Sequence, residues 1–229
     1  MEHPAQTYTG RIISVDNKGE DIRILHVKPA SAFSFAAGQY MRLSVNNAEP
    51  RYFSIASAPE DDLLSFHIRH TGHGFSALAF SSLTEGSDIT LEGPMGHGVP
   101  APPERPLLLL AGGIGIAPML SVIRHRIHNG LAAPVTLYWG VRDKTQIYLH
   151  DVFRALADEH DAFSYIPLVS DTPCPGIRNG FAGTAVTEDY DDLSASSIYM
   201  AGPRAMIDAT MPLLAAKKAD LDYVFQDIF

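Results

Sequence analysis

Four consecutive residues, Arg51, Tyr52, Phe53 and Ser54, bring together a cation, two aromatic rings and a hydroxyl group. If this segment is a strand, alternation sends Arg51 and Phe53 to one face and Tyr52 and Ser54 to the other. A guanidinium suits a phosphate, an aromatic surface suits a planar ring, and a hydroxyl suits a ring heteroatom. The same four residues also fit a barrel strand with a buried aromatic residue and a surface arginine.

A second candidate segment is a glycine turn that follows the apolar run 107–111. A buried strand that ends in glycines lets the backbone approach a ligand, and the unpaired N–H groups of a following helix suit a pyrophosphate. Gly112, Gly113 and Gly115 form the turn, and Pro118 stands where the usual dinucleotide fingerprint has its third glycine. Proline is acceptable there in the first turn of a helix. The segment predicts either a nucleotide-binding turn or a tight structural turn.

Three further apolar runs end in polar residues or glycine. Arg142 follows the first, Ser170 and Asp171 follow the second, and Gly202 and Pro203 follow the third. Each taken alone is an ordinary strand-to-helix turn. Because the carboxyl ends of parallel strands meet at one edge of a sheet, together they predict a crevice beside the glycine turn.

The first half of the chain reads as short alternating runs separated by Asn, Gly, Asp and Pro turns, which predicts an antiparallel β-barrel or sandwich. The expected strands are 8–15, 22–27, 39–45, 51–55, 65–69 and 88–91, with one short helix at 76–83. The Gly- and Pro-rich stretch 93–105 predicts a loop leading into a linker. We therefore expect two domains, 1–103 and 104–229.

In the second half, short apolar runs alternate with helical patterns, which predicts βαβ units and an α/β, Rossmann-like parallel sheet. The expected strands are 107–111, 135–138, 164–169 and 198–201, and the expected helices are 117–129, 150–159, 184–190 and 203–217. The acidic run 188–192 is expected to be a solvated loop.

Composition narrows the function. The 229 residues carry a formal net charge of −9, which argues against a nucleic-acid partner. The single cysteine, Cys174, cannot close an internal disulfide or supply an iron–sulfur cluster, so redox chemistry would need an organic cofactor.

The histidines lack the spacing of a metal site, and we expect no metal. The N-terminus has no signal-peptide pattern, and the uncharged stretch 106–123 is broken by glycines and prolines, so we expect a cytoplasmic protein without a membrane span.

Taken in order, these segments resemble the ferredoxin-NADP reductase superfamily over nearly the whole chain. The resemblance rests on Gly38-Gln39-Tyr40, Arg51-Tyr52-Phe53-Ser54, His67-Ile68-Arg69 with Gly74-Phe75-Ser76, Gly93-Pro94-Met95-Gly96, the turn from Gly112 to Pro118, and Met200-Ala201-Gly202-Pro203. It implies a flavin-binding barrel followed by an NAD(P)-binding domain, and hydride transfer from NAD(P)H to the flavin N5.

The resemblance also implies roles for single residues. In the barrel, Arg51 would neutralise a flavin phosphate, Phe53 would support or edge the flavin ring beside Tyr52, and Ser54 would donate a hydrogen bond near N5. For FAD, which is favoured over FMN, the implied pyrophosphate segment comprises His67, Arg69, Gly74, Phe75 and Ser76.

In the second domain, the resemblance implies that Gly112, Gly113, Gly115 and Pro118 form the turn that admits the dinucleotide. Gly202 and Pro203 would shape the nicotinamide pocket. Asp227 and Phe229, near the end of the chain, would steady charge near the flavin ring and lie over it, although a terminal aromatic residue also fits core packing.

Two positions where the sequence departs from the pattern of the superfamily indicate which of its subgroups the chain resembles. Ala201 stands where many members have a cysteine, and no cysteine-rich segment is present, which is similar to single-component NAD(P)H:flavin oxidoreductases. Asp171 after Ser170 would repel a 2′-phosphate and favours NADH, whereas Arg142 could pair with that phosphate and keeps NADPH open. Three functions follow as alternatives: a flavin reductase, an FAD-containing reductase that serves a separate ferredoxin, oxygenase or cytochrome, and a non-catalytic NAD(P)H-sensing module.

Overall fold

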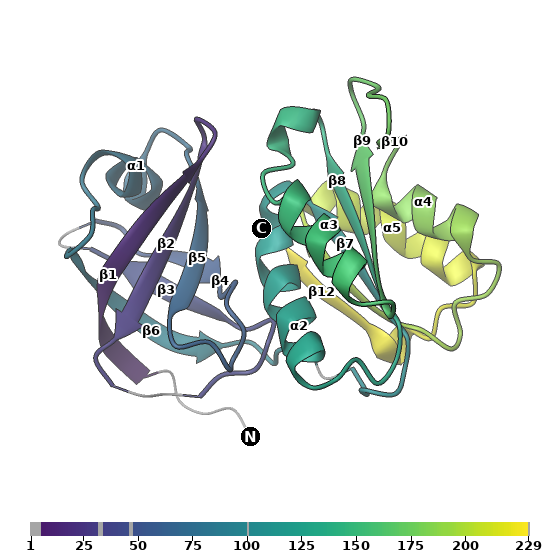
Figure 1. Cartoon of the computed structure of the whole chain (residues 1–229), viewed down its shortest axis with the longest axis horizontal. Helices are drawn as coiled ribbons and strands as arrows, with labels where there is room; N and C mark the ends of the chain where they lie inside the picture. Colours follow the sequence, from purple (N-terminus) through teal and green to yellow (C-terminus); the bar gives the residue numbers. More distant parts are fainter. Residues whose placement is uncertain (1–5, 32–33, 46–47, 100, 229) are drawn as a thin grey trace. The chain divides into compact units, whose positions relative to one another are not determined.

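A computed structural model of the chain describes residues 6–31, 34–45, 48–99 and 101–228. The chain divides into two units, Met1–Val99 with Leu120–His125, and Pro100–Met119 with Arg126–Phe229. Figure 1 shows a sheet built by the first half of the chain and a second sheet, flanked by helices, built by the other half.

The first unit contains a six-stranded antiparallel sheet in the order β4-β3-β6-β1-β2-β5, which forms a nearly closed barrel. Its strands are β1 (Gln6–Lys18), β2 (Ile22–Pro29), β3 (Tyr40–Ser44), β4 (Arg51–Ser54), β5 (Leu64–Arg69) and β6 (Asp88–Met95), and its helix is α1 (Gly74–Ser81). Alternation sets the core: Ile89 and Leu91 of β6 are buried, whereas Thr90 between them is exposed. The predicted antiparallel barrel is confirmed.

The stretch predicted to be a loop from residue 93 onward begins as a strand. β6 continues to Met95, because Gly93 pairs with Gln6 of β1 and Met95 pairs with Tyr40 of β3. The hydrogen bonds between strands are made by backbone groups, and the neighbouring strands β1 and β3 fix the register of β6. The strand therefore continues through residues that lack large apolar side chains. The prediction of a loop was wrong for residues 93–95.

The second unit contains a parallel six-stranded sheet in the order β10-β9-β8-β7-β11-β12. The strands are β7 (Leu107–Gly112), β8 (Val135–Val141), β9 (Phe163–Val169), β10 (Arg178–Asn179), β11 (Ser197–Gly202) and β12 (Val224–Ile228). The helices are α2 (Ile116–His128), α3 (His150–Glu159), α4 (Ala182–Asp189) and α5 (Arg204–Ala216), with short 3₁₀ turns η1 (Gly113–Gly115), η2 (Lys144–Gln146) and η3 (Leu221–Tyr223). This confirms the predicted βαβ organisation.

Helices α4 and α5 lie side by side (Figure 1). They enclose a core with one face of the sheet, to which Leu108, Tyr138 and Met200 contribute. Trp139, next to Tyr138 on β8, contacts Phe153 of α3, so the two faces are covered by different helices. Burial on both faces explains the uninterrupted apolar runs in these strands. Among the described residues, no helix is both long enough and apolar enough to cross a membrane.

The acidic run predicted to be a solvated loop is in part helical. Glu188 and Asp189 form the end of α4, and both carboxylates bind Arg178 of β10. Sequence alone does not reveal this partner, because the pairing of β10 with β9 is what places Arg178 beside α4.

Candidate functional site

The glycine turn lies where the order of the parallel sheet reverses. β7 is central, with β8 on one side and β11 on the other, and all three strands point the same way. In such sheets the crevice beyond the carboxyl ends of the two strands at the reversal accommodates ligands. Gly112 ends β7 and Gly202 ends β11, so the predicted turn and the predicted Gly-Pro pair meet at this edge.

Packing explains several of these glycines without a ligand. A Cβ atom on Gly115 would overlap the carbonyl oxygen of Ala201, and one on Gly112 would overlap the sulfur of Met206 and come within 3.1 Å of Pro203 Cδ. Gly113 has a φ of +55°, a left-handed conformation that glycine adopts without strain. The turn is therefore a tight structural turn, and this feature is compatible with nucleotide binding by its backbone.

Backbone groups at the turn are partly accessible. Gly113 is partly exposed, whereas Gly115 and Pro118 are buried, and Pro118 is the third residue of α2. The indole Nε1 of Trp139, a fully buried residue of β8, donates a hydrogen bond of 2.9 Å to the carbonyl oxygen of Gly113. Trp139 is not among the predicted site residues, although the strand end at Trp139 and Gly140 was expected beside the turn.

The outer strand ends also come together. The backbone N–H groups of Ser170 and Asp171 donate to the carbonyl oxygens of Val141 and Arg142, each at 3.0 Å. The Ser170 hydroxyl donates to a carboxylate oxygen of Asp171 at 2.6 Å. The structure thus places Arg142, Ser170 and Asp171 at one edge, as the strand pattern predicted.

Phe181 is an aromatic residue at the same edge that the sequence analysis did not select. It immediately precedes α4 and is 67% exposed, and a Cβ atom on Gly140 of β8 would lie 3.8 Å from the backbone nitrogen of the next residue, Ala182. A large exposed ring beside strand ends can stack on a planar ligand. The available signal was an aromatic residue between Gly180 and the start of a helix.

In the barrel, the predicted phosphate and ring residues converge from two segments. A Cβ atom on Gly74 would lie 3.9 Å from both Nε and Nη2 of Arg51, and Gly74 has a φ of +58° at the start of α1. The ring centroids of Phe53 and Phe75 are 5.2 Å apart, so a second contact joins the same two segments. A guanidinium beside the amino end of a helix is chemically suited to an anion such as a flavin phosphate. The Glu49 carboxylate lies 3.4 Å from Arg51 and competes for this cation.

The strand register confirms the predicted alternation on β4. Phe53 pairs with buried Met41 and packs against the barrel core, whereas Tyr52 is 62% exposed and meets the ring of Tyr40 edge-on at 5.7 Å. Ser54 shares the face of Tyr52. Tyr52 therefore offers the larger accessible aromatic surface, and Phe53 offers at most part of its ring.

The remaining phosphate-site predictions fit less well. His67 is 4% exposed and burial, with the nearby His26, lowers its pKa to about 3, so it is neutral at pH 7 and supplies no cation. The Ser76 hydroxyl donates to the His73 carbonyl oxygen at 2.9 Å and accepts from the Thr71 amide at 3.0 Å, which commits it to the loop before α1. Arg69 lies 3.6 Å from the Asp21 carboxylate.

Of the two terminal candidates, Asp227 is half-buried on β12, where it pairs with Ala201 of β11. Phe229 lies outside the described residues. Within the described ranges, no three His, Cys, Asp or Glu side chains gather closely enough to hold a metal ion.

Comparisons with known proteins match the two halves of the chain to two different domain families. A family model described as an FAD-binding domain matches residues 7–98, and one described as an oxidoreductase NAD-binding domain matches residues 109–211. The ferredoxin–NAD(P)(+) reductase component of a naphthalene 1,2-dioxygenase system from Pseudomonas putida is 30% identical over 100% of this chain and 71% of that protein. An NAD(P)H-flavin reductase from Vibrio harveyi is 33% identical, with 90% of each chain covered. The crystal structure of the Amycolatopsis cytochrome P450 reductase GcoB aligns with a TM-score of 0.92 at 30% identity, covering 99% of this chain and 71% of that one.

Proposed function

The chain belongs to the ferredoxin-NADP reductase superfamily, and from this premise we propose that it is an oxidoreductase that moves a hydride from NAD(P)H to a bound flavin. One observation carries the proposal: an FAD-binding and an NAD-binding domain model match successive parts of one chain. It is supported by residues in each part whose chemistry suits the group that the model names. A bound flavin supplies the centre that accepts a hydride and passes electrons on.

For the flavin, we assign Arg51 and the amino end of α1 at Gly74 to a phosphate, because the cation and the helix start lie together. Tyr52 and the accessible part of Phe53 contact the ring, and Ser54 donates a hydrogen bond near its reacting nitrogen. The FAD-binding domain model supports FAD over FMN. Arg69 and the backbone at Phe75 and Ser76 are the candidates for its second phosphate.

For the pyridine nucleotide, the turn at Gly113 and the amino end of α2 receive the pyrophosphate. Gly202 and Pro203 shape the nicotinamide end, and Asp227 on the neighbouring strand lies at the same edge. Asp171, hydrogen-bonded by Ser170, accepts hydrogen bonds from ribose hydroxyls and repels a 2′-phosphate, which favours NADH.

As the main candidate we propose a cytoplasmic flavin reductase, in which flavin binds as a substrate, accepts the hydride and leaves in its reduced form. Support comes from the Vibrio harveyi relative, which is named an NAD(P)H-flavin reductase and aligns over 90% of both chains. The second candidate is an FAD-containing reductase that serves a separate ferredoxin, oxygenase or cytochrome. It is favoured by the Pseudomonas putida relative, although this chain spans 71% of that protein.

The test begins with the absorbance spectrum of the purified full chain and mass identification of anything released on denaturation. A flavin reductase gives colourless protein whose NADH oxidation appears on addition of flavin. A yellow protein that reduces a one-electron acceptor much faster than free flavin supports the second candidate. If the protein binds NADH but does not oxidise it, whichever flavin or dye is added, both candidates are contradicted. The non-catalytic NAD(P)H-sensing module is then the remaining alternative.

A further inference from the structure

The segment that joins β9 to α4, residues 170–181, carries the proposed ribose site at its start and the exposed Phe181 at its end. Its backbone is held near both ends: Asp171 donates to the Arg142 carbonyl oxygen, and Gly180 donates to the Val169 carbonyl oxygen at 2.9 Å. Between them, β10 pairs with β9 through two residues only. The course of this segment therefore depends on side-chain contacts as well.

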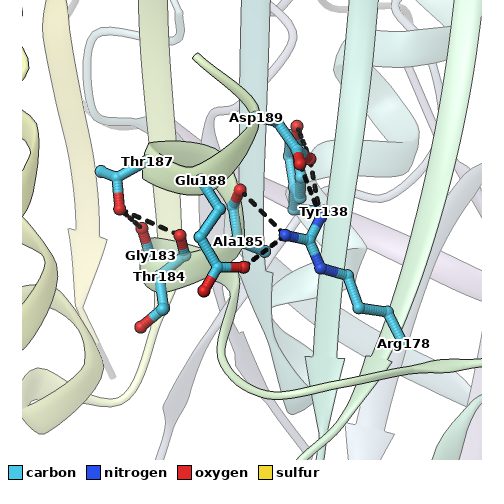
Figure 2. A network of polar contacts seen from close by, with 8 residues as sticks. All are labelled: Tyr138, Arg178, Gly183, Thr184, Ala185, Thr187, Glu188 and Asp189. Atoms are coloured by element: carbon cyan, nitrogen blue, oxygen red, sulfur yellow. Dashed lines mark hydrogen bonds and ion pairs between the residues drawn. The ribbon is translucent and has the colours of Figure 1, made fainter. Parts of the chain in front are cut away.

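Arg178 provides those contacts (Figure 2). Its Nη1 donates to both carboxylate oxygens of Asp189, at 2.9 and 2.7 Å, and its Nη2 donates to Glu188 at 2.5 Å and to the Ala185 carbonyl oxygen at 3.4 Å. All three partners lie on α4, and the two carboxylates belong to its last two residues. A cation there offsets two adjacent carboxylates at the negative end of the helix.

A buried tyrosine fixes the other side of this contact. Tyr138 of β8 is 1% exposed and its hydroxyl donates to Asp189 at 2.8 Å. Burial raises the pKa of Tyr138 well above its usual range, with the hydrogen bond to Asp189 as a further cause, so the hydroxyl keeps its proton. Burial raises the pKa of Asp189, but the hydrogen bonds from Arg178 and Tyr138 outweigh it and leave that pKa below its usual range.

The contact differs from an ordinary surface ion pair. The side chains of Arg178 and Asp189 are only 30% and 33% exposed, the guanidinium binds the carboxylate through two oxygens, and the carboxylate is oriented by the protein core. Isolated exposed pairs contribute little, whereas pairs within a hydrogen-bonded network restrict geometry as well as contribute free energy. Loss of Arg178 would release β10 from α4 and leave two adjacent carboxylates without their cation.

We propose that Arg178 is a positioning residue for pyridine-nucleotide binding, acting through residues 170–181 and not by touching the nucleotide. This inference rests on the proposed function. Its guanidinium is committed to α4, so it sets the position of Asp171 and Phe181 at the sheet edge while taking no part in hydride transfer. The affinity for NADH then depends on Arg178, and the rate of the chemical step does not.

The experiment compares Arg178→Gln and Arg178→Lys with the parent chain in steady-state NADH oxidation with added flavin, and in calorimetric titration with NAD⁺. Arg178→Gln is expected to raise KM and the NAD⁺ dissociation constant about five- to tenfold while kcat stays within about twofold. Arg178→Lys keeps the charge without the planar fork and restores part of the affinity. Hydrogen exchange at Gly180 and Phe181 is expected to accelerate in Arg178→Gln.

Lys218→Gln is the matched control, since it removes the 3.0 Å contact of Lys218 with Asp192 in the same unit, where neither residue belongs to 170–181. It should leave KM unchanged. If Arg178→Gln does not fold, Tyr138→Phe removes one hydroxyl from the same network and should raise KM by about twofold.

Faster exchange without a change in the NAD⁺ dissociation constant overturns the proposal. So does an equal rise in KM for Lys218→Gln, or a loss of kcat that matches the rise in KM. If the parent chain binds NAD⁺ but oxidises no NADH, the proposed function fails, and the titration alone still decides the role of Arg178.

Discussion

The indole Nε1 of Trp139 donates its hydrogen bond to the carbonyl oxygen of Gly113, across the two central strands of the parallel sheet. This bond fixes the orientation of a peptide group within the turn at the start of α2. Because the indole is fully buried, the packing around it holds the donor in place. The geometry of the turn therefore depends on a residue of the neighbouring strand.

Trp139→Phe keeps a ring in the core but removes the hydrogen bond. We expect the second unit to lose about 0.5–1.5 kcal/mol of unfolding free energy, because one hydrogen bond is lost while the Gly113 carbonyl oxygen keeps its bond from the Ile116 amide. We expect KM for NADH to rise about fivefold. Thermal unfolding and steady-state kinetics measure the two effects. Phe153→Leu disturbs packing against the same indole without touching the bond, and should lower stability with little change in KM. Equal KM effects in both variants would refute a specific role for the bond.

Gly115 is predicted to matter for packing and not only for ligand access. A Cβ atom there would overlap the Ala201 backbone, which cannot move without shifting β11. We expect Gly115→Ala to destabilise the second unit by about 1–3 kcal/mol or more, as overpacked cores do. Gly140→Ala is the control, because its Cβ atom would lie 3.8 Å from the Ala111 carbonyl oxygen and from the Ala182 nitrogen, which is ordinary van der Waals contact. Unfolding midpoints that coincide with the parent for Gly115→Ala would contradict this prediction.

Local patterns predicted all six strands of the first sheet and four of the six strands of the second, because periodicity of apolar residues follows directly from burial on one or both faces. The helix predicted at 150–159 has the bounds of α3. The end of β6 was missed, since its pairing with Gln6 and Tyr40 depends on register between distant segments. The strand β10 was missed because two residues carry no periodic signal.

The candidate site was predictable where a motif is contiguous, as for Arg51 to Ser54 and the turn at Gly112 to Gly115. The burial of a side chain, or its contact with a distant partner, could not be predicted from the sequence. His67 fits the alternation of its strand as well as a ligand-binding residue would, and only its burial shows that it supplies no cation. Arg178 was not selected at all, because its partners on α4 lie seven to eleven residues away across a turn.

The buried His67 is expected to make the stability of the folded chain sensitive to acid. Its pKa falls from an ordinary value of 6.5 to about 3 in the folded chain, mainly because burial disfavours the imidazolium. Between these values the unfolded chain binds the proton and the folded chain does not, so stability is full above pH 6.5 and is lost as pH falls toward 3. The expected loss is about 1.4 kcal/mol per pH unit from this group.

Denaturant unfolding of the parent chain and of His67→Gln between pH 7 and 4 measures this dependence. The variant should show a shallower loss of stability with falling pH, whatever its stability at pH 7. His128→Gln changes an exposed histidine and should keep the slope of the parent chain. Parallel curves for the parent and His67→Gln would show that His67 is not the proton-linked group.

Asp171→Arg tests the preference for NADH. The Asp171 carboxylate is held by the Ser170 hydroxyl at the end of β9, where a like charge on a 2′-phosphate would be repelled. Replacing it with a guanidinium exchanges repulsion for a charge-assisted hydrogen bond, and the ratio of kcat/KM for NADPH to that for NADH should rise at least about tenfold, or 1.4 kcal/mol. Asp161→Arg makes the same change of charge just before the opposite end of β9 and should leave the ratio unaltered. A ratio that shifts equally in both variants would mean that net charge, and not the ribose site, governs the choice of nucleotide. An unchanged ratio in Asp171→Arg would remove Asp171 from that site.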